Sequence, residues 1–133
     1  MLADSIDTNI IIHSILDEPG AQRERIMQFL NRPDATHFVF DIAISEAVYV
    51  LEKFYLQSRI EIANNLTLFF DQFNDCLKYN KAITKMILPF WVEHPSLSFN
   101  DCYLGFRAEF DSVEPLFTLD KKLAAQHPSA KLI

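Results

Sequence analysis

Short apolar segments alternate with longer amphipathic ones along the chain. The apolar runs Leu2–Ile6, His37–Phe40, Pro115–Leu119 and Lys131–Ile133 have the length of short strands, and acidic or turn-forming residues flank most of them. Short strands alternating with helices predict βαβ units and a parallel sheet. The expected fold class is therefore α/β, with a short-stranded central parallel sheet between two helical layers.

Local signals place the intervening helices. Helices are predicted over Thr8–Leu16 and Ala21–Asn31, and a helix over Thr84–Glu93 is expected to bend at Pro89 or to begin there. Ser58-Arg59-Ile60-Glu61 and Ser98-Phe99-Asn100-Asp101 read as capping boxes that start two more helices. The remaining evidence is helical spacing of apolar residues, in the set Ile44, Val48, Leu51 and Tyr55 and in the set Ala63, Leu66, Phe70, Phe73 and Leu77.

The length and composition predict one domain over residues 1–133. The chain has 133 residues, half of them hydrophobic, and no linker, repeat or low-complexity segment. With only two glycines, Gly20 and Gly105, it contains no glycine-rich phosphate loop, which excludes nucleotide binding of the P-loop or Rossmann kind. Two cysteines without zinc-ligand spacing are expected to be reduced thiols.

The net charge of −6 limits how this chain would bind nucleic acid. Proteins that hold nucleic acid by neutralising phosphates are usually basic, so such a role here requires a local basic patch or metal ions. The apolar runs are too short to span a bilayer, and no basic segment followed by an apolar run suggests a signal peptide. We expect a cytoplasmic protein with no membrane contact.

Four carboxylates recur at one structural position. Asp7 and Asp120 follow predicted strands, while Glu46 and Asp101 lie in the first turns of predicted helices. Strand carboxyl ends and helix amino ends share one edge of a parallel sheet, which is where ligands bind. Four acids at that edge repel one another unless a cation neutralises them, and Mg²⁺ and Mn²⁺ prefer oxygen ligands. Taken singly, each acid has an equally ordinary role as a helix cap.

Four motifs in this order resemble those of PIN domains. Asp7–Ile12 resembles the opening DTN motif, Ser45–Glu52 an acid before a Val/Leu-rich helix, Phe99–Leu104 an F-x-D-A-x-L pattern, and Phe117–Leu123 a T-x-D-x-x-L pattern. Within PIN domains, the chain is most similar to the VapC toxins of toxin–antitoxin pairs. Cys102 and Gly105 stand where alanines are usual, and both are small enough to keep the helix packing.

The resemblance implies a single PIN-like domain that cleaves RNA with Mg²⁺ or Mn²⁺ as a toxin. It implies a homodimer inhibited by a VapB-like antitoxin, and products with 5′-phosphate and 3′-hydroxyl ends. In this interpretation the catalytic and metal-binding residues are Asp7, Glu46, Asp101 and Asp120. Asp41 competes with Glu46 for the second position, although the motif alignment favours Glu46. Two alternatives remain: a non-catalytic PIN-like binding module and a structure-specific DNA nuclease.

Two further sets of residues are candidates for function. Thr8, Asn9 and Thr118 flank the acids and are expected to orient them by hydrogen bonds, although ordinary turn and cap chemistry explains Thr8 and Asn9 as well. Twelve phenylalanines are many for this length, so an aromatic surface for the antitoxin is expected where two consecutive helices meet. The residues proposed for that surface are Phe54, Tyr55, Phe69, Phe70 and Phe73.

Overall fold

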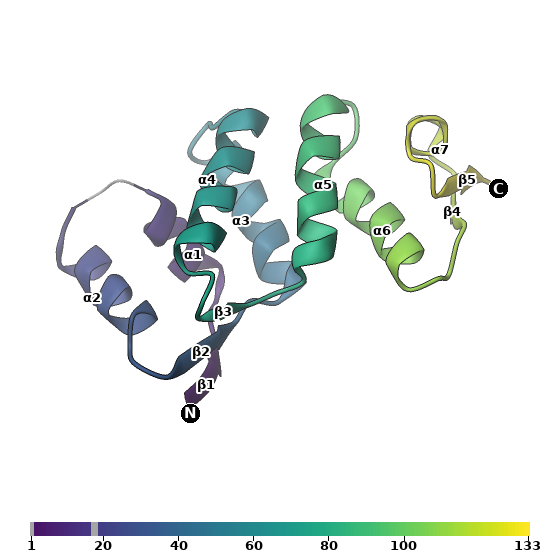
Figure 1. Ribbon diagram of the computed structural model, residues 1–133. Helices are drawn as coiled ribbons and strands as arrows, with labels where there is room; N and C mark the ends of the chain where they lie inside the picture. The colour runs from purple at the N-terminus through teal and green to yellow at the C-terminus, as the bar shows by residue number, and fades with distance from the viewer. Residues whose placement is uncertain (1, 17–18) are drawn as a thin grey trace. The chain divides into compact units, whose positions relative to one another are not determined.

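The fold is α/β, with short parallel strands in open sheets. The computed structural model describes residues 2–16 and 19–133, in two compact units, Met1–Tyr79 and Asn80–Ile133. Each unit is described by itself, and Figure 1 gives the labels of its elements. The single domain over residues 1–133 stays a prediction.

The first unit contains a three-stranded sheet and four helices within its described residues. The strand order is β1-β2-β3, and both pairings are parallel. Its elements are β1 (Leu2–Ser5), α1 (Thr8–Ile15), α2 (Ala21–Leu30), β2 (Ala35–Phe38), α3 (Asp41–Lys53), α4 (Arg59–Gln72) and β3 (Leu77–Lys78).

Local capping explains where the helices of this unit begin and end. The Ser58 hydroxyl accepts a hydrogen bond from the Glu61 N–H at 3.3 Å and donates to the Glu61 carboxylate at 3.0 Å, which confirms the predicted start of α4. At the carboxyl end of α1, the Arg23 guanidinium donates to the carbonyls of Ser14 and Leu16. A cation at a helix carboxyl end offsets the negative end of the helix dipole.

The core of this unit lies among the helices that pack on α1. Helices α2, α3 and α4 all contact α1, and α3 also contacts α4. Their inward positions are mostly aliphatic, with Phe69 and Phe70 added from α4, and burying each such side chain contributes roughly 1.5–3 kcal/mol to folding. The most completely buried are Ile11, Ile12, Leu30, Leu51, Ile62 and Leu66.

The second unit pairs two helices and a small sheet. Helix α5 packs on α6, and β4 pairs with β5 in parallel across the short helix α7. Ser98 accepts a hydrogen bond from the Asp101 N–H at 3.1 Å, as the second predicted capping box requires. The elements are α5 (Lys81–Glu93), α6 (Phe99–Phe110), β4 (Leu116–Thr118), α7 (Lys121–Gln126) and β5 (Ala130–Leu132).

Some predicted boundaries are wrong. The second strand begins two residues earlier than predicted, at Ala35, and ends at Phe38 because Phe40 already caps α3. Pro89 lies inside α5 rather than in its first turn, and because proline has no N–H it cannot donate a helical hydrogen bond to the Lys85 carbonyl. Helices α3 and α4 end before Tyr55 and Leu77, and Leu77 instead begins β3, a strand that the sequence analysis did not predict.

Gly105 has a packing role that the motif comparison did not anticipate. A Cβ atom added at Gly105 would lie 2.4 Å from the ring of His127, which follows α7 and is buried against the rings of Phe90 and Phe106. Burial lowers the pKa of His127, more than the nearby Cys102 carbonyl and the Glu109 carboxylate raise it. The imidazole therefore stays neutral near pH 7, and the absence of a side chain at Gly105 leaves room for its ring.

We expect Gly105→Ala to lower the free energy of unfolding by about 1–3 kcal/mol, because the added methyl group collides with a buried ring. Urea denaturation followed by circular dichroism measures the loss. The double variant Gly105→Ala/His127→Ala should be less destabilised than the two single effects added together, since removing the ring makes room for the methyl group. A Gly105→Ala protein as stable as wild type contradicts this packing.

Candidate functional site

Asp7 lies at the carboxyl end of β1, where it caps the following helix. Its Oδ1 accepts hydrogen bonds from the N–H groups of Asn9 and Ile10, at 3.1 and 3.3 Å. The structure thus shows the ordinary capping role of Asp7. Its other oxygen, Oδ2, accepts no hydrogen bond within residues 2–16 and 19–133, so that it remains open to a ligand.

Glu46 shares a pocket with Asp7. This pocket, with a volume of about 300 Å³, lies where β1 and β2 lead into α1 and α3. The Thr8 hydroxyl donates to Glu46 Oε2 at 2.8 Å and so fixes the orientation of that carboxylate. Asp41 does not line the pocket, which favours Glu46 over Asp41 as the partner of Asp7.

Asp101 and Asp120 belong to the second unit. Asp101 lies in the first turn of α6, and its carboxylate accepts no hydrogen bond in the part of the chain that is described. Asp120 caps α7 as Asp7 caps α1: its Oδ1 accepts from the N–H groups of Lys122 and Leu123, at 2.9 and 3.2 Å. Thr118 accepts from the Asp120 N–H at 3.0 Å, at the end of β4.

Asp7, Glu46 and Asp120 therefore share one arrangement. Each is held through one oxygen, and the second oxygen has no hydrogen-bond partner in the described ranges. Such a carboxylate suits a hard divalent cation, which takes oxygen ligands and keeps several waters. No group of three or more His, Cys, Asp or Glu that could hold a metal ion occurs within residues 2–16 and 19–133. Convergence of all four acids stays a prediction.

A second pocket adjoins Asp7 on its other side. Its volume is about 510 Å³, and it shares Ser5, Ile6 and Asp7 with the carboxylate pocket. One face of α1 and one face of α2 form its walls, with Phe29 at the carboxyl end of α2. The helical residues that line it are Asn9, Ile10, His13, Gln22, Arg25 and Ile26.

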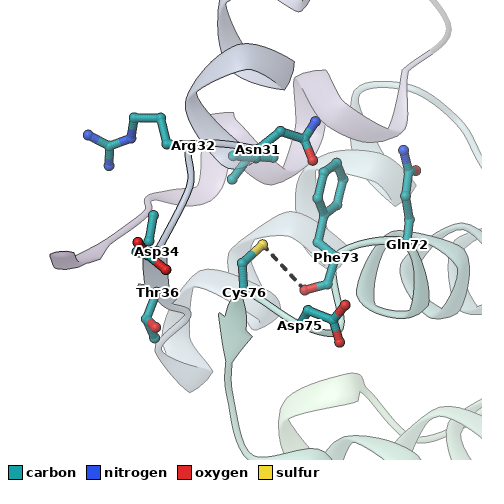
Figure 2. Close-up of a pocket in the computed structure, with 10 residues that line it drawn as sticks. Asn31, Arg32, Asp34, Thr36, Gln72, Phe73, Asp75 and Cys76 are labelled. Atoms are coloured by element: carbon teal, nitrogen blue, oxygen red, sulfur yellow. Dashed lines mark hydrogen bonds between the residues drawn. The ribbon is translucent and has the colours of Figure 1, made fainter. Parts of the chain in front are cut away.

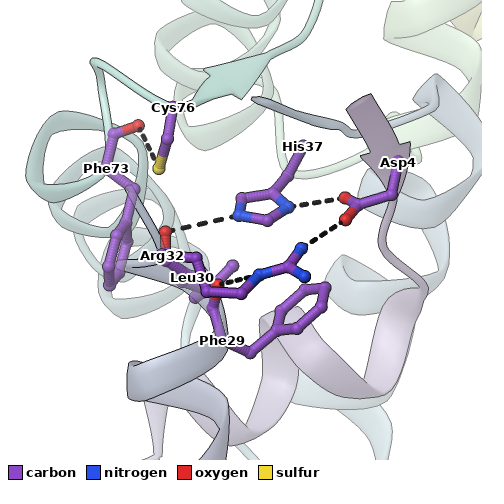
Figure 3. Close-up of polar contacts among 7 residues, drawn as sticks. All are labelled: Asp4, Phe29, Leu30, Arg32, His37, Phe73 and Cys76. Carbon is purple, nitrogen blue, oxygen red and sulfur yellow. Dashed lines mark hydrogen bonds and ion pairs between the residues drawn. The ribbon is translucent and has the colours of Figure 1, made fainter. Parts of the chain in front are cut away.

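A buried histidine lies in a polar cluster beneath Phe29, and the sequence analysis assigned it no partner. His37 is fully buried, and its Nδ1 lies 2.5 Å from Asp4 Oδ1 (Figure 3). Arg32 donates to the other oxygen of Asp4 at 2.7 Å, and its guanidinium lies over the Phe29 ring, 4.3 Å from the centroid. The hydrogen bond from His37 and the charges of His37 and Arg32 lower the pKa of Asp4, against a smaller opposing effect of burial.

The strand register explains this cluster. Asp4 and His37 occupy paired positions of β1 and β2, so that their side chains project side by side from the same face of the sheet. No hydrophobic pattern reveals such a pair, because register in a four-residue parallel ladder follows from the tertiary packing.

A third pocket lies at the opposite, amino end of β2. It has a volume of about 570 Å³, and polar groups dominate its walls (Figure 2). The Cys76 thiol donates to the Phe73 carbonyl at 3.5 Å, and burial raises the pKa of this thiol. Asp34 and Asp75 give the pocket more negative than positive charge, since Arg32 is the one cation among its described lining residues and is paired with Asp4.

The expected aromatic surface is wrong for three of its five residues. Phe69, Phe70 and Phe73 are each only 3% exposed and pack against one another within the first unit. Phe54 and Tyr55, at the end of α3, are 73% and 43% exposed. The helical spacing of Phe70 and Phe73 was thus a core pattern, and only Phe54 and Tyr55 remain candidates for a partner surface.

No helix in the described ranges is both long and apolar enough to cross a membrane. No known protein-family model matches the sequence, and no curated protein gives a significant match.

Proposed function

We propose that this chain is a metal-dependent endoribonuclease with a PIN-like, three-layer α/β/α fold, acting as the toxin of a toxin–antitoxin pair in the cytoplasm. The observation that carries the proposal is the pocket shared by Asp7 and Glu46 at the carboxyl end of the parallel strands, where one oxygen of each carboxylate accepts no hydrogen bond from residues 2–16 and 19–133. The four-motif resemblance to PIN domains supports RNA as the substrate.

In this proposal the four acids serve the same metal ions, with Mg²⁺ or Mn²⁺ as the cofactor. Asp7, Glu46 and Asp101 hold the principal ion, and Asp120 completes the site or holds a second ion. When bound, the metal supplies a water of lowered pKa and charge to stabilise the phosphate oxygens. The donor set fits such an ion, because carboxylate oxygens are its preferred protein ligands.

The chain's own residues then have separate tasks. Thr8 keeps the Glu46 carboxylate turned into the pocket, and the cap on α1 keeps Asp7 in place. The free oxygen of Glu46, or Asp101, accepts the proton of the attacking water. Attack at phosphorus breaks the bond to the 3′ oxygen of the preceding nucleotide, which leaves a 5′-phosphate and a 3′-hydroxyl.

One specific observation favours the non-catalytic binding module as the second candidate. Asp7 and Asp120 both cap helices, so that their presence has a purely structural explanation. Metal binding and cleavage separate the two candidates, and a preference for structured DNA over RNA identifies the third, a DNA nuclease.

The proposed antitoxin and homodimer contacts involve the exposed end of α3. Phe54 and Tyr55 precede Leu56, which is also exposed, so that three large apolar side chains lie together in sequence on the surface. An apolar cluster of this kind is typical of protein interfaces.

Asp7→Asn should lower the rate of RNA cleavage by about 100-fold or more, while the protein folds normally. Asparagine caps a helix as well as aspartate does but brings no negative charge to a metal. Cleavage of total cellular RNA in Mg²⁺ or Mn²⁺ is the measurement, and Asp71→Asn, an exposed acid on α4, is the matched control. Equal cleavage by Asp7→Asn and wild type removes Asp7 from the site.

Binding of the metal should stabilise the folded chain. At roughly ten times its dissociation constant, Mg²⁺ or Mn²⁺ should raise Tm by about 3–6 °C, because only the folded state offers the ligands together. Thermal scans with and without EDTA measure this rise, and Asp7→Asn should lose it while Asp71→Asn keeps it. An unchanged Tm in wild type over the whole millimolar range favours the binding module.

Expression of the wild-type chain without a partner should arrest bacterial growth, because an unrestrained ribonuclease stops translation. Asp7→Asn, produced at the same soluble level, should leave growth unaffected. Growth curves after induction, with immunoblots for the soluble protein, compare the two. Arrest by both variants alike would assign the toxicity to something other than cleavage.

A further inference from the structure

The pocket between α1 and α2 has the chemistry of a nucleobase site. Its walls are apolar, with Ile10 and Ile26 from the two helices and Phe29 at one end. Its volume of about 510 Å³ lies within the usual range for small-molecule sites and exceeds what a single base needs. Apolar and aromatic walls are the surfaces on which RNA-binding proteins stack unpaired bases.

Four polar side chains at this pocket have unused hydrogen-bonding capacity. The side chains of Asn9, His13, Gln22 and Arg25 form no hydrogen bond or ion pair with any residue of the ranges 2–16 and 19–133. Amide groups both donate and accept, as the edges of a base require, and Arg25 offers a charge for a phosphate. Elsewhere in the same unit, the pocket at the amino end of β2 carries Asp34 and Asp75, which repel a phosphodiester.

The Asp4–Arg32–His37 cluster supports one wall of the pocket. Arg32 covers one face of the Phe29 ring, and the His37 ring lies 4.9 Å from it, centroid to centroid (Figure 3). Asp4 binds both Arg32 and His37, and these two side chains restrict the Phe29 ring on the side that faces away from the pocket. A rigid aromatic wall is pre-organised for stacking, so that no ordering cost arises when a base binds.

We infer that this pocket accepts one unpaired base of the RNA, next to the phosphate that is cleaved, and thereby selects the cleavage sequence. The role of this pocket in cleavage rests on the proposed function. Asp7 links the two sites, because it lines both this pocket and the carboxylate pocket. Gln22 and Asn9 are the residues that distinguish one base from another, and Arg25 binds the adjoining phosphate.

A binding experiment without metal tests the pocket independently of catalysis. Wild-type protein in EDTA is titrated with the four nucleoside 5′-monophosphates, and NMR follows the side-chain amide signals of Asn9 and Gln22. These signals should shift and saturate, with one base preferred, whereas the amide of Gln28, an exposed residue of α2 outside the pocket, should not move. Absence of saturable shifts for all four nucleotides overturns the inference.

Matched variants assign the roles within the pocket. Gln22→Leu should weaken binding of the preferred nucleotide roughly three- to tenfold, the cost of one hydrogen bond, and Gln28→Leu should leave it unchanged. Arg25→Gln should weaken binding of the nucleoside monophosphate but not binding of the corresponding nucleoside, which has no phosphate. Equal affinities of wild type and Gln22→Leu for every nucleotide overturn the role of Gln22.

The cleavage profile then connects the pocket with the active site. Sequencing of RNA ends should show that Gln22→Leu relaxes the base preference beside the cut, whereas Gln28→Leu keeps both the preference and the total cleavage of wild type. An unchanged profile contradicts the inference and leaves the nuclease intact. Saturable, Gln22-dependent nucleotide binding by a wild type that cleaves no RNA contradicts the proposed function and supports the base site.

Discussion

The parallel pairing of β1 with β2 is the constraint on which the rest of the first unit depends. It sets Asp4 beside His37, and the ladder continues where the Ile6 N–H donates to the Phe38 carbonyl at 3.0 Å. Beyond that hydrogen bond, β1 leads into α1 and β2 leads into α3, so that Asp7 and Glu46 reach the same pocket. A slip of one residue would turn Asp4 away from His37 and move both carboxylates.

This strand register places two sets of polar side chains on either side of Phe29: the Asp4–Arg32–His37 cluster and the pocket between α1 and α2. Below the ring, the carboxylate of Asp4 contacts both Arg32 and His37; the Asp4 and Arg32 side chains are partly exposed, and the His37 imidazole is buried. Above it, the pocket beside Asp7 is lined by the side chains of Asn9, His13, Gln22 and Arg25, which have no hydrogen-bond partner among residues 2–16 and 19–133. The Asp4 side chain contacts those of Arg32 and His37, whereas these four side chains of the pocket make no such contact with the residues that the structure describes. That contrast separates structural polar residues from candidate binding residues in this chain.

Local signals in the sequence predicted much of the fold. Features that depend on contacts between distant residues were missed. The caps at Ser58, Ser98 and Asp120 depend on neighbouring backbone groups, so that sequence spacing alone revealed them. Strand β3 has two residues, too few for any periodicity. Asp7 and Glu46 were predictable because strand ends share an edge, but the Asp4–His37 contact needed the register. The aromatic residues of α4 were misread as surface because the count of phenylalanines says nothing about which face they occupy.

Capping and metal binding are compatible in one aspartate because a carboxylate has two oxygens. In Asp7 and Asp120 the backbone N–H groups donate to Oδ1 and hold the plane of the carboxylate, while Oδ2 accepts no hydrogen bond from the residues that the structure describes. The positive end of the helix dipole also stabilises the charge that a bare acidic pocket would otherwise resist. The cap is therefore more than an alternative to a metal-binding role. In the proposed metal site, the cap orients the carboxylate and stabilises its charge, so that helix capping and the proposed metal binding use different oxygens of the same side chain.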